Sequence, residues 1–315
     1  MNSPSPPLDR PLAAADRTAR IGLAFGLLAY ALWGVLPIYF KALAEVPAID
    51  IVAHRIVWSL LFLCVLVAVT RGWNQIAGGL RDRRTLSLLL VTSALIAVNW
   101  LLYVYAVTSG HILAGSLGYY LNPLMNIVLG RFILKERLTN LQWAAVAIAA
   151  AGVTVLAWGA GTTLWISLTL CVTFATYGLL RKIAAIDAIA GMAIETAILF
   201  PLALGWLLWG FSAGQPSFGS SDTETWLLVA AGVVSTTPLL LFTAAARRLR
   251  YSTLGILQFI APTLQFIIAV WLYGEAFTTA HAIAFGAIWT ALALYVASLL
   301  HTMRNASRPA ELTCG

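Results

Sequence analysis

Ten long apolar runs, each of about 18 to 23 residues, make up most of this chain and constrain its fold more than any other feature. A helix needs about 20 residues to cross a hydrocarbon core of about 30 Å. Only 10% of the residues are charged, whereas about 25% are charged in an average soluble protein. We therefore expect an all-α polytopic membrane protein with ten transmembrane helices. The expected spans are 21–42, 50–70, 86–108, 112–133, 141–158, 163–182, 189–210, 225–246, 252–273 and 280–301.

Basic residues are distributed unequally between the links that join these runs. If alternate links are counted from the N-terminal tail, one set holds 17 of the 19 Lys and Arg residues, and only Lys41 and Arg55 lie outside it. Cytoplasmic links carry an excess of Lys and Arg, so both termini are predicted to be cytoplasmic. The net charge of +7 is explained by this topology, and no nucleic-acid partner is expected.

One stretch of the sequence occurs twice. Pro123 and Glu136 recur 139 positions later as Pro262 and Glu275, with an apolar segment between them in each copy. Two five-span units are therefore predicted, and because five is odd, the second unit enters the membrane from the opposite side. Inverted repeats of this kind are common in secondary transporters. The predicted divisions are a disordered tail at 1–19, units at 20–160 and 161–301, and a second tail at 302–315.

Polar side chains cluster around the two repeated prolines. A proline removes one helix hydrogen bond, and we expect breaks at Pro123 and Pro262. Near Pro123, three residues share a helical face, and near Pro262 two glutamines are spaced in the same way. These faces are predicted to line a substrate path, although amides between membrane helices also act as structural glue. The residues are Tyr119, Asn122, Asn126, Gln258 and Gln265.

Aromatic side chains with polar tips lie in three further spans. Such groups suit a pocket for an amphipathic or cationic organic solute. Ordinary packing or an interfacial aromatic belt is the alternative explanation. The candidate lining residues here are Trp33, Asn99, Trp100, Tyr103 and Tyr177.

Three residues with acidic or basic side chains are predicted inside spans and away from their first and last turns. An Arg or Asp at the middle of a membrane helix costs roughly 2.5–3.5 kcal/mol. His54 and Arg55 lie in the second span, and Glu195 lies in the seventh, at the position that the repeat aligns with His54. One hypothesis is an Arg55–Glu195 ion pair, or a relay that includes His54, which changes with the transport state. The alternatives are a fixed structural pair and an Arg55 side chain that reaches out of the membrane.

No enzyme motif is found, and no metal site or cofactor is expected. The chain contains no GxSxG, HExxH or phosphate-binding loop, and no stretch long enough for a nucleotide-hydrolysing domain. Cys64, Cys171 and Cys314 have no metal-binding or disulfide spacing.

Several segments of the sequence resemble a known family. They are AYALWGVLPIYFKAL (29–43), AHRIVWS (53–59), NWLLYVYAV (99–107), SLGYYLNPLMNIVLGRFILKERL (116–138) and YGLLRK (177–182). These segments resemble the RarD-type permeases of the EamA group, in the drug/metabolite transporter superfamily. The resemblance implies a ten-helix permease of the bacterial inner membrane, with a central cavity lined by spans 1, 3, 4, 6, 8 and 9, and with spans 5 and 10 at the periphery. It implies no particular substrate.

The expected function is alternating-access transport of a small organic metabolite or drug-like solute, with export favoured over uptake. The lipid bilayer is the solvent, a proton or counter-solute is a candidate coupling partner, and the protein is expected to be a monomer or homodimer. The alternative is a membrane sensor or assembly partner that keeps the permease fold without transporting. A transporter should have a central cavity open to one side, and a scaffold should be packed shut.

Overall fold

The computed structural model describes residues 9–133, 139–214, 218–219, 221–246, 248 and 257–306, and every element in these ranges is helical. The side chains of Pro123 and Asn126 lie outside the described part, as do Glu136 and the ends of both predicted tails. The helices are α1 (Asp9–Lys41), α2 (Ala48–Thr70), α3 (Trp73–Arg81), α4 (Arg83–Thr108), α5 (Ile112–Phe132), α6 (Asn140–Ala160), α7 (Leu164–Ile183), α8 (Ala188–Ser212), α9 (Asp222–Ala246), α11 (Ile260–Ile267), the π-helix η2 (Ile268–Leu272) and α12 (Thr279–Ala306), with a 3₁₀ turn, η1 (Gly161–Thr163), before α7.

Six of these helices are long and apolar enough to cross a membrane: Arg20–Lys41, Ala48–Thr70, Arg83–Thr108, Leu164–Arg181, Ile189–Ser212 and Asp222–Ala245. Shorter apolar stretches occupy Trp143–Leu156, Ile260–Leu272 and Thr279–Leu294. The protein is therefore an all-helical membrane protein, as the apolar runs predict. Each of the ten predicted ranges overlaps a described helix.

One link and one tail differ from the sequence-based expectation. The link after α2 contains the short helix α3, which starts after a left-handed residue, Arg71, and is followed by Asp82. The Asp82 carboxylate accepts hydrogen bonds from the backbone of Arg84 and Thr85, and so caps α4. At the other end of the sequence, α1 begins at Asp9, inside the range expected to be a tail, where an alanine-rich segment favours helix.

The predicted break at Pro123 is wrong, because α5 continues without interruption from Ile112 to Phe132. A proline costs one helix hydrogen bond, and the bonds on either side hold this helix together. In the second copy the backbone turns at Gln258 and Phe259, and α11 begins at Ile260. Pro262 therefore lies in the first turn of α11, where its missing N–H removes no intrahelical bond.

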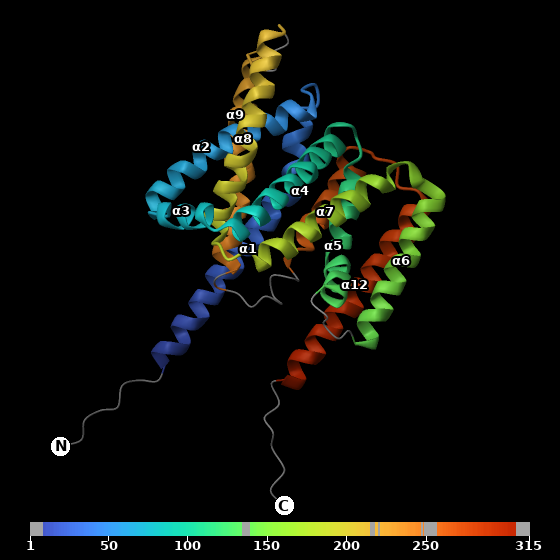
Figure 1. Ribbon diagram of the computed structural model, residues 1–315. Helices are drawn as coiled ribbons and strands as arrows, with labels where there is room; N and C mark the ends of the chain where they lie inside the picture. Colours follow the sequence, from blue (N-terminus) through green and yellow to red (C-terminus); the bar gives the residue numbers. More distant parts are fainter. Residues whose placement is uncertain are drawn as a thin grey trace, which may run out of the picture.

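The helices pack around one large apolar core that draws side chains from most of them. Helix α1 contacts α9 and α11, α2 contacts α8 and α9, α4 contacts α7 and α8, and α5 contacts α7 and α11. Helices α6 and α12 contact each other along their length and lie at one side of the molecule, away from α2 and α3 (Figure 1). Their close approach depends on Gly152, where an added Cβ would lie 2.6 Å from Ala287.

Candidate functional site

Asn99 joins three helices at the centre of the bundle. Its side-chain nitrogen donates to the carbonyl of Leu170 at 3.0 Å and to the hydroxyl of Thr173 at 2.9 Å, both on α7. Its side-chain oxygen accepts a hydrogen bond from the Tyr119 hydroxyl on α5 at 3.2 Å. Asn99 is 1% exposed, and these bonds satisfy it. This geometry fits the packing alternative for Asn99 and the structural-glue alternative for Tyr119, and it brings together two of the predicted path residues.

Arg55 lies beside this cluster, on α2. Its guanidinium carbon is 4.0 Å from the ring centroid of Trp100, a cation–π contact. The hydroxyls of Tyr39, Tyr103 and Tyr119 are close enough to interact with it electrostatically. The rings of Tyr103 and Tyr119 lie 5.5 Å apart. The Arg55 guanidinium thus contacts α4 and lies within electrostatic range of tyrosines on α1, α4 and α5, so it does not extend out of the bundle as the alternative supposed.

The remaining predicted path residues are more scattered. Gln265 donates to the carbonyl of Trp33 at 3.1 Å and so ties α11 to α1, and its side-chain oxygen is buried with no partner in the described structure. The Asn122 side-chain oxygen is likewise buried without a described partner. Gln258 is half-buried. Of the predicted path residues with described side chains, the half-buried ones are Trp33, Trp100, Tyr119, Tyr177 and Gln258, and the buried ones are Asn99, Tyr103, Asn122 and Gln265.

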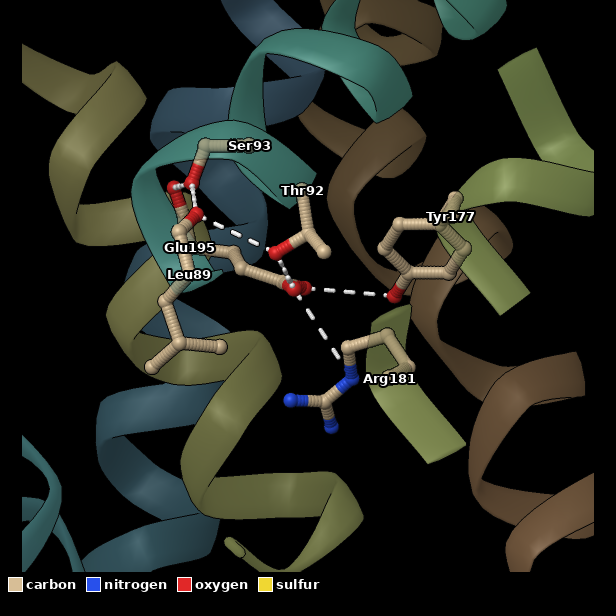
Figure 2. A network of polar contacts seen from close by, with 6 residues as sticks. All are labelled: Leu89, Thr92, Ser93, Tyr177, Arg181 and Glu195. Atoms are coloured by element: carbon tan, nitrogen blue, oxygen red, sulfur yellow. Dashed lines mark hydrogen bonds and ion pairs between the residues drawn. The ribbon is translucent and has the colours of Figure 1, made fainter. Parts of the chain in front are cut away.

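Glu195 is the centre of a second polar network, between α4, α7 and α8 (Figure 2). One carboxylate oxygen accepts from the Thr92 hydroxyl at 2.6 Å, and the other accepts from the Tyr177 hydroxyl at 3.2 Å. The Nε of Arg181 lies 3.7 Å from the carboxylate. Glu195 is 2% exposed, so a buried acid is met by two hydroxyls and one guanidinium.

The hypothesis of an Arg55–Glu195 ion pair is therefore wrong. Among the described residues Glu195 pairs with Arg181, and Arg55 stacks on Trp100. His54 does not join either group. It stacks on Phe218 with ring centroids 5.3 Å apart, and its Nε2 is buried with no described partner. The three residues predicted to act together thus lie in three separate environments.

Arg181 and Thr92 are the network residues that the sequence pattern does not predict. Arg181 was counted as a charge of a cytoplasmic link, but it lies inside α7. It follows Tyr177 by four positions, so the two share one helical face. That spacing could have indicated a shared target on the facing helix. Nothing in the sequence pairs Thr92 with α8.

Gly191 makes room for this ion pair. It precedes Glu195 by four positions on α8, and an added Cβ there would collide with the guanidinium of Arg181. Because Gly191 has no side chain, the Arg181 guanidinium can pass over α8 at this point and reach the Glu195 carboxylate.

Gly191→Ala should displace the Arg181 guanidinium from Glu195 and destabilise the protein by about 1–3 kcal/mol, the usual cost of leaving a buried polar group without its partner. Thermal unfolding in detergent measures this. Gly205→Ala on the same helix is the matched control, because nothing lies within 4 Å of a Cβ added there. Equal stability of the two variants would contradict the close approach of Arg181.

The two duplicated stretches contact each other, through α5 in the first copy and α11 in the second. The Ser116 hydroxyl donates to the carbonyl of Pro262 at 2.7 Å, and the hydroxyls of Tyr120 and Thr263 lie 2.5 Å apart. The Glu275 carboxylate accepts hydrogen bonds from the backbone N–H groups of Ile112 and Leu113 at 2.6 and 2.7 Å. A glutamate of the second copy therefore caps the helix of the first.

Neither of two hollows found among the described residues is lined by the predicted path residues. One lies between α5, α11 and α12 and is bordered by Tyr120, Thr263 and Trp289. The other lies between α2, α3 and α8 and is bordered by Cys64, Trp73 and Ile194. Both are lined mainly by apolar side chains. Within the described residues, no group of three or more His, Cys, Asp or Glu residues is placed to hold a metal ion.

Comparison with known proteins gives consistent matches. Residues 20–158 match the EamA-like transporter family. An "Uncharacterized transporter" of Vibrio cholerae serotype O1 is 45% identical over 89% of this chain and 93% of its own length. An uncharacterized transporter of Pseudomonas aeruginosa is 44% identical over 94% of this chain and 99% of its own. "Protein RarD" of Escherichia coli strain K12 is 43% identical over 93% of this chain and 99% of its own.

A solved crystal structure with 22% identity covers 89% of this chain and 98% of its own, with a TM-score of 0.58, which shows a common fold. The family and the names of the relatives point to a transporter and away from an enzyme. On this evidence the chain belongs to the EamA-like transporter family, among its RarD-type members.

Proposed function

We propose that the protein is a secondary active transporter of the bacterial inner membrane that moves a small organic solute by alternating access. In this proposal ten helices cross the membrane and both termini are cytoplasmic. The two units are 20–160 and 161–301, between tails at 1–19 and 302–315, and they are related by an inverted repeat. Export is favoured over uptake, and a proton or counter-solute is the candidate coupling partner.

The observation that carries this proposal is the symmetry of the helix contacts. In the proposed repeat, α1, α2, α4, α5 and α6 correspond to α7, α8, α9, α11 and α12. Exchanging each helix with its counterpart turns the α1–α9 contact into α7–α4, α2–α9 into α8–α4, and α1–α11 into α7–α5, and all six contacts occur. The remaining major contacts, α2–α8, α5–α11 and α6–α12, join a helix to its own counterpart. This is the pattern expected of two units related by a twofold axis.

The proposed path runs between the two units, beside the partly exposed Trp33, Trp100 and Tyr119. These three side chains are half-buried and pack against the apolar core that both units share. The Glu195 network is the candidate gate, because Thr92 belongs to the first unit while Arg181 and Glu195 belong to the second. Contacts that cross the unit boundary must change if the units move against each other.

The function can be tested by flux in liposomes that contain the purified full-length chain. Transport is expected only with protein present, and it should change when a proton gradient is imposed if protons are coupled. Preparing the liposomes with outward and inward gradients gives the direction. No flux of any solute from a broad panel of metabolites would favour the alternative, a sensor or assembly partner with the permease fold.

Glu195→Gln should reduce flux about tenfold, as expected if one charge-assisted contact of the gate is lost, and should alter the pH dependence of transport. Glu45→Gln is the control, because Glu45 is an exposed glutamate in the turn after α1. Unchanged flux and unchanged pH dependence in the Glu195 variant would exclude this network as the gate or proton relay.

A further inference from the structure

Arg55 is a charged residue in the interior of the bundle, and its partners among the described residues are all aromatic. It lies in α2, its guanidinium is 4.0 Å from the Trp100 ring centroid, and three tyrosines on α1, α4 and α5 lie within electrostatic range of it. An arginine inside a membrane span is costly and is normally paired or functional. The position of Arg55 therefore calls for a negatively charged counterpart.

No acid of the described chain supplies that counterpart. Glu195 is held by Arg181, Thr92 and Tyr177. Asp50, on the same helix as Arg55, accepts a hydrogen bond from the Trp206 indole at 2.6 Å. Glu275 is bound to the N-terminus of α5. Each acid near the interior thus has another partner, and Arg55 keeps an uncompensated charge within the described structure.

The groups that remain available around Arg55 can donate hydrogen bonds. The guanidinium has five N–H groups and no acceptor. Tyr103 is 5% exposed, its hydroxyl has no hydrogen-bond partner in the described structure, and it lies within electrostatic reach of Arg55. The face of Trp100 that could attract a cationic solute is already occupied by the guanidinium. An arriving cation would meet a positive charge, whereas a carboxylate would meet two donors.

We propose that Arg55 and Tyr103 form the head-group site for a small organic anion with one carboxylate, whose apolar body packs on the neighbouring aromatic rings. This proposal rests on the transport function proposed above and names its substrate class. Of the amphipathic or cationic solutes that the aromatic residues alone suggested, it keeps an amphipathic one and makes it an anion. Arg is the residue suited to the site, because its planar fork matches the two oxygens of a carboxylate.

Binding can be measured on the full-length chain in detergent by the shift in thermal unfolding and by tryptophan fluorescence, with no transport required. The probes are benzoate and hexanoate, their neutral amides benzamide and hexanamide, the cation benzylammonium, and phenyl phosphate. The two carboxylates should stabilise the protein in a saturable way, and the amides and the cation should not. Stabilisation by phenyl phosphate alone, or by the amides or the cation, would overturn the assignment of a carboxylate site.

Substitutions locate the site. Arg55→Gln should weaken benzoate binding about 10- to 100-fold, Arg55→Lys should weaken it less, and Tyr103→Phe should weaken it about tenfold, as expected for loss of hydrogen bonds to a charged group. Arg248→Gln is the matched control, because Arg248 also lies over an aromatic ring, Phe25 at 5.5 Å, but is exposed. Benzoate binding that survives Arg55→Gln unchanged would also overturn the proposal.

The unliganded Arg55→Gln variant gives an independent readout. Because Arg55 has no described acid partner, neutralising it should leave the unfolding temperature of the unliganded protein unchanged or raise it. A marked fall would mean that Arg55 is a structural counter-charge and would overturn the proposal. Flux measurements separate the two proposals. Carboxylate binding without any flux would contradict the transport function and leave the anion site standing. Flux of cations without carboxylate binding would contradict the anion site and leave the transport function standing.

Discussion

Arg181→Met should destabilise the protein by about 3–5 kcal/mol, the usual cost of removing one partner from a buried ion pair. The variant leaves the Glu195 carboxylate 2% exposed, with only the hydroxyls of Thr92 and Tyr177 as donors. Two neutral donors do not compensate for a buried charge that has lost its counter-charge. Denaturant unfolding in detergent micelles measures the loss.

The double variant Arg181→Met, Glu195→Gln should recover most of this stability, since the amide is neutral and still bonds to both hydroxyls. Arg84→Met controls for the loss of a positive charge, because Arg84 is exposed at the start of α4. If the single variant unfolds like the native chain, and the second substitution adds nothing, then Glu195 is not an ionised partner of Arg181.

The same network marks the boundary of what sequence can predict. The apolar runs indicated the helices, because a membrane requires about 20 apolar residues per span, and the described helices overlap every predicted range. Glu195 was recognised as unusual because a charge within an apolar run is costly. Its partner was not recognised, because Arg181 lies at the end of a run, where a basic residue is also expected from topology alone.

Pairing between helices depends on helix rotation, which apolar periodicity determines poorly when both the core and the lipid are apolar. Arg55 shows this most clearly. One hypothesis from the sequence paired Arg55 with Glu195, whereas in the structure its guanidinium lies over Trp100 on α4. The short helix α3 was not predicted, for a different reason. Its nine residues are too few and too polar to form a membrane span. The spacing of the apolar runs predicts the helices, whereas the contacts at the site depend on the direction of each side chain.

Glu275 carries the second large expected effect. Its carboxylate is the acceptor for the buried N–H groups of Ile112 and Leu113, two of the unpaired donors at the start of α5. Glu275→Ala should therefore cost roughly 1–3 kcal/mol for each N–H left unsatisfied. Glu275→Gln should cost less, because its amide oxygen still accepts one bond. Glu45→Ala, an exposed glutamate in the turn after α1, should change stability little and serves as the control.

Glu275 also predicts a pH dependence. Burial raises the pKa of Glu275 above its ordinary value of 4.5, and this effect outweighs the two backbone hydrogen bonds and the nearby Lys41, which act in the opposite direction. The folded state therefore holds this proton more tightly than the unfolded state, so the corresponding stability is present below pH 4.5 and is lost as the pH rises through the raised pKa. Unfolding measured from pH 4 to pH 8 should show this decline in the native chain and lose it in Glu275→Gln. A decline of the same size in the glutamine variant would assign it to another group, and Glu275 would then be a cap without a titrating role.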